Sequence, residues 1–367
     1  MKTKIISFIK KETVLCISAI LAVISMFFVP PSAEYVSYID FRTLVLLFCL
    51  MAVMSGFRKI GLFSALANSL LEKSRNFQMV SLILVLLCFF TSMLITNDVA
   101  LITFVPFAIE VVRKSEKNKF MIPIIVLQTI AANLGSMLTP MGNPQNLYLY
   151  SLSGMSITDF ILLVLPYTAI SLVLLIIFNF SIKASYIEYN PSKTSFPAKS
   201  AVFYAVLFLI CMLAVINIID YKICFVITIL AILIFNRKLI TDVDYSLLMT
   251  FVFFFIFVGN MGNIEGFKNL ILTLIKGREM IVSVAASQII SNVPAAVVLS
   301  SFTENVKELL QGVNIGGLGT PIASLASLIT IKFYMRHKES KIGKFIIYFL
   351  ASNILALILL TVFVYII

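Results

Sequence analysis

One polar pattern occurs twice within this apolar chain, and it constrains the fold more than any other feature. The first copy reads TNDVALITFVPF at residues 96–107 and is followed by NLGSMLTP at residues 133–140. The second copy reads SNVPAAVVLSSF at residues 291–302 and is followed by NIGGLGTP at residues 314–321. Each copy places an Asn-centred polar break inside apolar sequence, and then a Gly-rich break that ends in Thr-Pro. The pattern predicts two repeats, each built from interrupted helices.

Long apolar segments predict a membrane protein. Hydrophobic residues make up 60% of the 367 residues, and the mean hydropathy is +1.06. A membrane-spanning helix needs about 20 apolar residues. The segments that reach this length, alone or with their flanks, are 13–29, 43–56, 121–138, 160–178, 201–218, 223–235, 246–258, 313–331 and 345–367. The first of them lacks the small-x-small cleavage site of a signal peptide, so we interpret it as a membrane helix.

The net charge of +11 raises the alternative of nucleic-acid binding, but the distribution of the charges argues against it. Lys and Arg lie in short loops rather than along one face, and positive loops set the orientation of membrane proteins. We therefore expect the lipid bilayer, and no nucleic acid, as a partner. The basic N-terminus, with Lys2, Lys4, Lys10 and Lys11, is predicted to be cytoplasmic.

Charge counting then fixes the predicted topology. Segment 78–112 has basic residues at both ends, so it is predicted to enter and leave on the cytoplasmic side as a re-entrant hairpin. Segment 280–304 lacks this positive bias and is predicted to be a second hairpin that enters from outside. An amphipathic stretch over 62–71 is expected at the cytoplasmic interface. The few Lys and Arg residues that fall outside are Arg42, Lys222, Lys268, Lys276, Arg278 and Lys307, of 28 in the chain.

The predicted fold class is an all-α polytopic membrane protein. It is an inverted-repeat bundle with about nine full crossings and two re-entrant hairpins. We expect an N-terminal transmembrane segment over 1–39 and a first repeat over 40–178. A connecting loop and transmembrane pair follow over 179–242. The second repeat and last transmembrane helix occupy 243–367, and the C-terminus is outside.

The polar breaks suit ion binding. Free N–H groups at helix N-termini favour anions, and free carbonyls at helix C-termini favour hard cations such as Na⁺. Ser92 lies one helical turn before Thr96, as Ser287 lies before Ser291, so each tip can offer two hydroxyl groups to a cation. The alternative is that Thr96 and Ser291 only cap the helix that follows.

Asp98 is the sole acidic residue predicted deep in the membrane region, where charges are costly and usually functional. It would bind a proton or complete a Na⁺ site, or else it only supplies negative charge to a helix N-terminus. The second repeat has Val293 at this place. The GNPQN stretch at residues 142–146 adds Asn143 as a candidate for substrate binding. For Gln145 and Asn146, a polar helix break alone is an equally good interpretation.

Several other functions are excluded or disfavoured. The five cysteines lack paired metal-ligand spacing, and His337 is the only histidine, so we expect no metal or organic cofactor. No GxxxxGK[ST] phosphate loop is present. An intramembrane protease would need a base near its nucleophile or a second membrane carboxylate. The chain is therefore predicted to be no enzyme.

The two copies and the GNPQN stretch resemble the ion transporter superfamily, and within it bacterial anion permeases of the divalent anion:sodium symporter, citrate transporter-like and arsenite permease group. The resemblance implies a homodimeric, elevator-type secondary transporter in the plasma membrane. It would move a small anion, a di- or tricarboxylate or an inorganic oxyanion, with Na⁺ or H⁺ as coupling ion. Arsenite efflux and Na⁺/H⁺ antiport through Asp98 remain open as alternatives.

The resemblance also implies site residues. Those that would contact substrate are Thr96, Asn97, Ser291 and Asn292. Asp98, Asn143 and Thr320 complete the predicted substrate-binding set. Those that would bind Na⁺ are Ser92, Thr96, Asn97 and Gly135 in the first repeat, and Ser287, Asn292, Gly316 and Thr320 in the second. Dicarboxylate carriers of this superfamily have Ser-Asn-Thr at both tips. Asp98 and Val293 replace the last hydroxyl here, which weakens the case for a dicarboxylate.

Overall fold

The computed structural model describes residues 12–72, 74–187, 196–336 and 340–366. These residues form helices joined by loops, with one isolated β-bridge between Asn76 and Tyr186. The basic N-terminal residues on which the predicted orientation depends, and His337, lie outside the described residues.

Eight of the described helices are long and apolar enough to cross a membrane, so the chain is an all-helical, polytopic membrane protein. They cover Phe41–Lys59, Phe77–Ile95, Asn118–Leu138, Ile157–Asn179, Ala198–Val215, Tyr221–Asp242, Tyr245–Gly262 and Ile342–Val364. Most of the predicted crossings coincide with one of these helices. The first predicted crossing, 13–29, is not among the eight, because its helix α2 covers only Thr13–Met26.

One predicted crossing, 313–331, is not a single helix. Helix α17 (Val306–Ile315) ends inside this segment, and helix α18 (Leu325–Met335) begins only ten residues later. The residues between them include three glycines and a proline, and Gly319 has a φ of +100° that other residues rarely adopt. The chain is therefore unwound at the Gly-rich break that the repeated pattern predicted.

The first predicted hairpin is an antiparallel helix pair, α6 (Phe77–Ile95) and α7 (Asn97–Lys114). Both pack against helix α8 (Met121–Gly135). The buried side-chain amide of Gln128 on α8 donates to the carbonyl of Leu84 at 3.2 Å and to that of Phe104 at 3.3 Å. Because these carbonyls lie on opposite sides of Thr96, the two arms fold back on each other with Thr96 at the tip.

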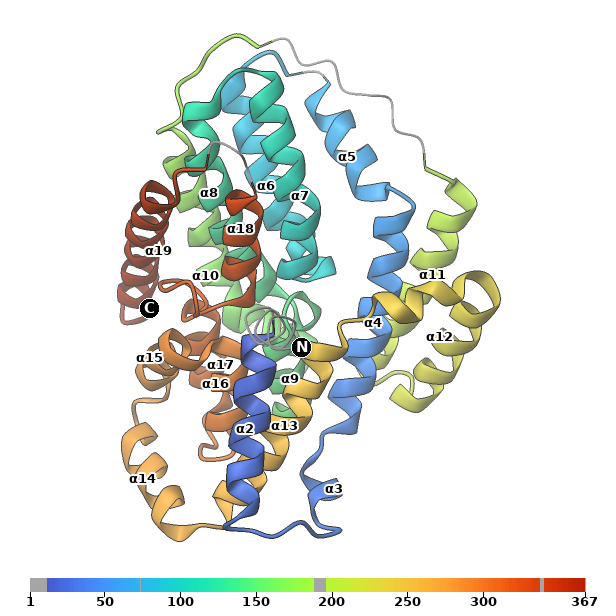
Figure 1. Ribbon diagram of the computed structural model, residues 1–367, viewed down its shortest axis with the longest axis vertical. Helices are drawn as coiled ribbons and strands as arrows, with labels where there is room; N and C mark the ends of the chain where they lie inside the picture. Colours follow the sequence, from blue (N-terminus) through green and yellow to red (C-terminus); the bar gives the residue numbers. More distant parts are fainter. Residues whose placement is uncertain (1–11, 73, 188–195, 337–339, 367) are drawn as a thin grey trace, which may run out of the picture.

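The second hairpin consists of α15 (Glu279–Ile290) and α16 (Asn292–Ser300), which meet at Ser291. Figure 1 shows the first hairpin in the upper part of the molecule and the second in the lower part. Both lie in a bundle completed by α9 (Pro144–Ser153), α10 (Ile157–Asn179) and α19 (Ile342–Val364).

Two runs of helices have the same order. A long helix, a short amphipathic helix, a hairpin, a broken helix and a long helix follow one another in α4–α10 and again in α13–α19. Helix α4 (Phe41–Lys59) leads to α5 (Leu62–Leu71), and α13 (Tyr245–Gly262) leads to α14 (Glu265–Ile275). Figure 1 places α5 at the top and α14 at the bottom.

The starts of these two runs are capped alike. Asp40 accepts a hydrogen bond from the Thr43 amide at 3.0 Å, and Asp244 accepts one from the Leu247 amide at 2.9 Å. A side-chain oxygen at this position satisfies a free N–H group of the first turn.

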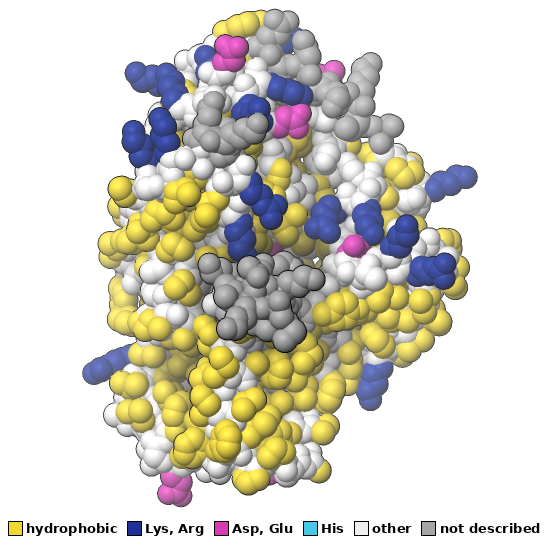
Figure 2. Space-filling view, in the orientation of Figure 1, with side chains coloured by type: hydrophobic (Ala, Val, Ile, Leu, Met, Phe, Trp, Pro, Cys, Tyr) yellow, Lys and Arg dark blue, Asp and Glu magenta, His cyan; other side chains and the backbone are white. Residues whose placement is uncertain are grey.

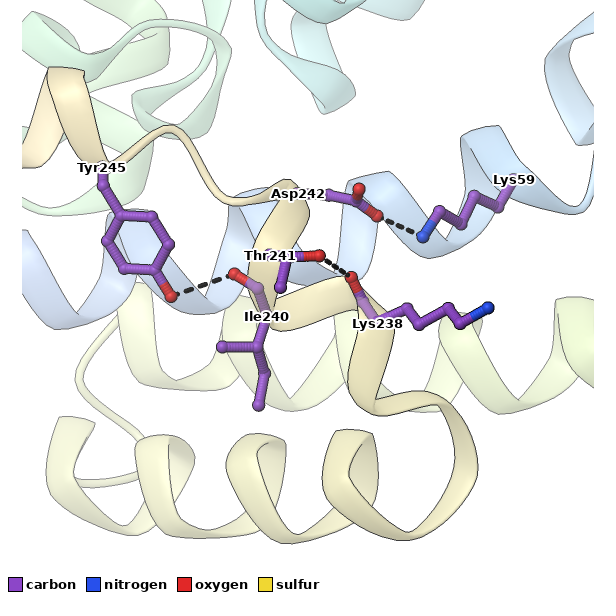
Figure 3. Close-up of polar contacts among 6 residues, drawn as sticks. All are labelled: Lys59, Lys238, Ile240, Thr241, Asp242 and Tyr245. Carbon is purple, nitrogen blue, oxygen red and sulfur yellow. Dashed lines mark hydrogen bonds and ion pairs between the residues drawn. The ribbon is translucent and has the colours of Figure 1, made fainter.

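The remaining helices, α11 (Ala198–Val215) and α12 (Tyr221–Asn236), pack against α4. The 3₁₀ turn η4 (Arg237–Asp242) joins α12 to α13, and Figure 3 shows how it is held. Lys59 at the end of α4 forms an ion pair with Asp242, and the Tyr245 hydroxyl donates to the Ile240 carbonyl at 2.9 Å. Figure 2 shows hydrophobic side chains over most of the lower half of the visible face, with Lys and Arg concentrated above.

Candidate functional site

The tips of the two hairpins border one small cavity. Its volume is only about 10 Å³, roughly the space of a single water molecule. It is lined by residues in pairs from four elements, Asn97 and Asp98, Pro144 and Gln145, Asn292 and Val293, and Ser324 and Leu325. The polar residues that the repeated pattern singled out are thus brought together by the fold.

Each of these pairs lies at a helix N-terminus. Helices α7, α9, α16 and α18 begin at the cavity, with Thr96, Asn143, Ser291 and Ser324 as their capping residues. Free N–H groups and a partial positive charge are found at such termini. Four of them around one cavity create a positive field inside an apolar protein, and this favours an anion.

The backbone at the two tips is unusual. Thr96 has φ 67° and ψ 149°, and Ser291 has φ 77° and ψ 152°, a region that is essentially restricted to glycine. Neither side chain forms a capping hydrogen bond with its helix, so the capping alternative does not explain these two residues. The second tip is instead tied to the unwound segment, because the Asn292 amide donates to the Ala323 carbonyl at 2.9 Å.

Asn133 connects the first tip to the second half of the chain. Its Oδ1 accepts hydrogen bonds from Asn97 Nδ2 and from Ser324 Oγ, both at 3.0 Å, and its Nδ2 donates to the Gly317 carbonyl at 3.3 Å. The quoted NLGSMLTP motif begins with this residue, but the predicted site did not include it. The repeated Asn at position 314 is the signal that points to it.

The predicted cation-binding groups also meet in pairs. A Cβ atom added to Gly135 would lie 2.8 Å from Ser92 Oγ, and one added to Gly316 would lie 2.8 Å from Ser287 Oγ. Each glycine therefore lets the backbone approach a serine hydroxyl closely. Since Asn97 and Asn292 lie at the neighbouring tips, each group offers hydroxyl, amide and backbone oxygens.

Thr320 is not brought to the cavity. Its hydroxyl donates to the Gln288 carbonyl at 3.0 Å, whereas Thr139 in the first run donates to the Met93 carbonyl. The two threonines therefore hold the Thr-Pro breaks against the hairpin arms in the same way.

Asp98 lies in the first turn of α7 and faces the cavity. Its Oδ1 atom is buried and has no hydrogen-bond partner among the described residues. The same holds for Asn143 Oδ1, Gln145 Nε2, Asn314 Oδ1 and Ser327 Oγ. Buried polar atoms are normally paired, so this concentration near the tips favours a ligand site.

Two polar residues of the GNPQN stretch have different environments. Gln145 lines the cavity, whereas Asn146 donates to the carbonyls of Ser136, Met137 and Thr139, each at 3.3 Å. Asn146 therefore stabilises the unwound backbone. Ser324 was not among the predicted site residues, although it follows the second Thr-Pro break as Asn143 follows the first.

Within the described ranges, no group of three or more His, Cys, Asp or Glu side chains forms a cluster that could hold a metal ion. A coupling cation at the tips would therefore be bound mainly by amide, hydroxyl and backbone oxygens. Such ligands suit a hard cation with flexible coordination.

Comparison with known proteins agrees with this architecture. Residues 5–312 match the citrate transporter family, and the chain belongs to that family. It is 32% identical to an uncharacterized transporter of Methanocaldococcus jannaschii over 86% of each chain. It is 29% identical to an inner membrane protein of Escherichia coli over 83% of each chain. A shorter match, 32% identical over 35% of this chain and 26% of the relative, is to a rice silicon efflux transporter.

The fold and the family together define a multi-pass membrane transporter of the citrate transporter type. The resemblance to the ion transporter superfamily is confirmed. An enzymatic function finds no support in the family or in these relatives.

Proposed function

We propose that the protein is a secondary active transporter that binds a small anion between the tips of its two hairpins. The observation that carries this proposal is the convergence of four helix N-termini on one cavity. A di- or tricarboxylate or an inorganic oxyanion would replace its hydration shell with N–H groups of these helices and with the amides of Asn97 and Asn292.

The proposed architecture is an inverted repeat with two re-entrant hairpins and about nine full crossings. The shared helix order of α4–α10 and α13–α19, and the opposite placement of α5 and α14, support it. Inverted repeats of this kind place their binding site near the bilayer midplane. The chain would lie in the plasma membrane as a homodimer, with a cytoplasmic N-terminus and an external C-terminus.

We propose an elevator mechanism for the transport cycle. The cavity of about 10 Å³ has no room for a carboxylate substrate, so the parts that surround it must move. The hairpins, α8, α10 and α19 pack as one bundle, whereas α4, α11, α12 and η4 pack with one another. Movement of the first group along the second would expose the tips to one side of the membrane at a time.

Na⁺ or H⁺ would supply the driving force. The groups around Ser92 and Gly135, and around Ser287 and Gly316, are the proposed Na⁺ sites, because each places a hydroxyl beside close backbone. Asp98 is the proposed proton-binding group, since it is acidic and faces the cavity. No organic cofactor is proposed.

Thermal stability of the purified protein tests the substrate class. It would be measured with and without Na⁺, across pH, against citrate, succinate, sulfate, phosphate and arsenite. A ligand that binds only the folded state raises its stability, by about 2.7 kcal/mol at a hundred times Kd. We expect one anion to raise Tm, and only with Na⁺ or at a particular pH. A response to Na⁺ or pH without any anion would contradict anion transport and favour Na⁺/H⁺ antiport.

A second candidate function is efflux of a neutral oxyacid such as arsenite. The match to a silicon efflux transporter and the carboxyl group of Asp98 at the tip favour it. A carboxylate repels anions but accepts hydrogen bonds from uncharged hydroxyl groups. Export of arsenite from loaded vesicles, without uptake of any carboxylate, would decide for this function.

The tip asparagines test the site itself. Asn97→Ala and Asn292→Ala each remove a buried side-chain amide beside the cavity. We expect each variant to lose at least about 90% of transport at equal membrane expression. Normal transport in both variants would show that substrate binds elsewhere.

A further inference from the structure

A second, much larger cavity lies where the start of α4 and helix α13 come close to α9 and α16. Its volume is about 550 Å³, and we call it the vestibule. Its lining comes from residues 37–42 and from parts of α9, α13 and α16. The lining residues used below are Ser37, Asp40, Arg42, Tyr148, Ser151 and Ser301.

The vestibule and the tip cavity are lined by successive turns of the same two helices. Helix α9 contributes Gln145 to the tip cavity and Tyr148 to the vestibule, and α16 contributes Val293 to the tip cavity and Val297 to the vestibule. About one helical turn, roughly 5 Å, separates the two spaces on each helix. A hydrogen bond of 2.9 Å between the Tyr148 and Ser300 hydroxyls joins α9 to α16 there. The vestibule is therefore an approach to the tip cavity.

Within the part of the chain that the structure describes, Arg42 is the only Lys or Arg that lines the vestibule. Its guanidinium donates to Ser151 Oγ at 3.3 Å and to the Val215 carbonyl at 3.1 Å. A guanidinium has five N–H donors, so further donors remain for a ligand. Both of these contacts are to neutral acceptors, and a carboxylate or oxyanion would bind more strongly than the serine hydroxyl.

The acidic residue of the vestibule is already satisfied. Asp40 accepts hydrogen bonds from the Thr43 amide at 3.0 Å and the Thr43 hydroxyl at 2.5 Å, at the N-terminus of α4. Both carboxylate oxygens of Asp40 therefore point toward the first turn of α4. The remaining polar lining consists largely of hydroxyl groups from serine and tyrosine. An anion can contact Arg42 and hydroxyl donors without meeting a free carboxylate.

We infer that the vestibule is a capture site for a small oxyanion or carboxylate, with Arg42 as its charged recognition residue. The inference rests on the proposed transport of an anion and adds a first binding step before the tip cavity. An arriving anion accepts the hydrogen bond that Arg42 now donates to Ser151 Oγ. Loss of that bond also breaks this contact between α4 and α9.

Thiol labelling tests the inference without any need for transport. Ser301 is exposed and lines the vestibule, so Ser301→Cys places a reporter there. Cys16→Ser is used as the background, because the other four native cysteines are buried. The reporter is treated with an anionic and a cationic methanethiosulfonate reagent, applied to each side of the membrane in turn. Each rate is divided by the rate of the same reagent with free cysteine.

We expect the anionic reagent to react about tenfold faster than the cationic one, because Arg42 keeps free N–H donors for an anion, whereas the Asp40 carboxylate accepts two hydrogen bonds at the start of α4. Arg42→Gln should abolish the preference, Arg42→Lys should retain most of it, and Asp40→Asn, which keeps a good capping residue, should increase it. Citrate or sulfate should slow labelling when Arg42 is present and have no effect in Arg42→Gln.

Equal rates for the two reagents, or an unchanged preference in Arg42→Gln, would overturn the capture site. Retention of the preference in Arg42→Lys shows that the charge, and not a folding defect, carries the effect. A protein that keeps the preference but moves no anion would contradict the proposed transport and not the site. A protein that transports anions but lacks the preference would contradict the capture site and not the proposed transport.

Discussion

Thr96 and Ser291 have nearly the same backbone conformation at equivalent hairpin tips, with φ 67° and ψ 149° at the first and φ 77° and ψ 152° at the second. Glycine would adopt this conformation without strain, whereas other residues pay about 1–3 kcal/mol. Both tips nevertheless have a residue with a hydroxyl group. Because the same strained conformation occurs at both tips beside one cavity, we infer that the two hydroxyl side chains are needed for function.

Replacement of either tip residue by glycine separates strain from function. Thr96→Gly should raise the free energy of unfolding by about 1 kcal/mol, because relief of the strain exceeds the added chain entropy of glycine. Transport should fall, because the hydroxyl is lost. Thr96→Val is the matched control, since it removes the hydroxyl and keeps the strain. Tm and initial uptake rates would be measured, and a Thr96→Gly protein that is both less stable and fully active would contradict this view.

Asn133 should matter more than its counterpart Asn314. Asn133→Ala removes the hydrogen bonds to Asn97, Gly317 and Ser324, whereas the Asn314 amide donates only to the Leu310 carbonyl within its own helix. At roughly 0.6–1 kcal/mol for each bond in a membrane protein, we expect Asn133→Ala to lose about 2 kcal/mol of stability. Asn314→Ala should lose less than half of that. Equal losses of Tm in the two variants would show that Asn133 does not connect the two halves as described.

The sequence was sufficient to predict the membrane class, the helical content and the two interrupted hairpins, because apolar length and polar breaks are local properties. The breaks at Thr96 and Ser291 lie where they were predicted. Other features depend on residues far apart in the chain. They are the contact of Asn133 with Ser324, the contacts of Gln128 with both arms of the first hairpin, and the vestibule around Arg42. No spacing rule reveals such contacts, nor that the Thr320 hydroxyl donates to the Gln288 carbonyl.

The close approach at Gly135 provides a stability prediction. A Cβ atom at this position would lie 2.0 Å from the Phe89 carbonyl oxygen, which belongs to the backbone of α6 and cannot move alone. Gly135→Ala should therefore destabilise the first hairpin by about 1–3 kcal/mol. Gly343→Ala is the matched control, because nothing lies within 4 Å of the added atom. It should be neutral or slightly stabilising, since alanine favours helix. Thermal unfolding of both variants checks the prediction, and a neutral Gly135→Ala would show that α6 and α8 pack more loosely.

Asp98 provides a test of the coupling ion. It faces the tip cavity, and its Oδ1 atom is buried with no hydrogen-bond partner among the described residues. A buried carboxylate without a partner is costly in its ionised form, so a proton or a bound cation would neutralise it. Asp98→Asn keeps the size of the side chain and cannot ionise. We therefore expect the variant to lose the dependence of transport on pH, or its dependence on Na⁺.

The matched control is Glu110→Gln on the same helix. Glu110 is largely exposed and pairs with Lys114 at 2.7 Å, far from the cavity, so its loss should leave both dependences unchanged. Initial rates would be measured in proteoliposomes over a range of pH at fixed Na⁺, and over a range of Na⁺ at fixed pH. A flat pH profile with retained Na⁺ dependence assigns the proton to Asp98, and the opposite result assigns it a role in binding Na⁺. If both profiles match those of the native protein, Asp98 takes no part in coupling, and the groups at Ser92 and Ser287 are the remaining candidates.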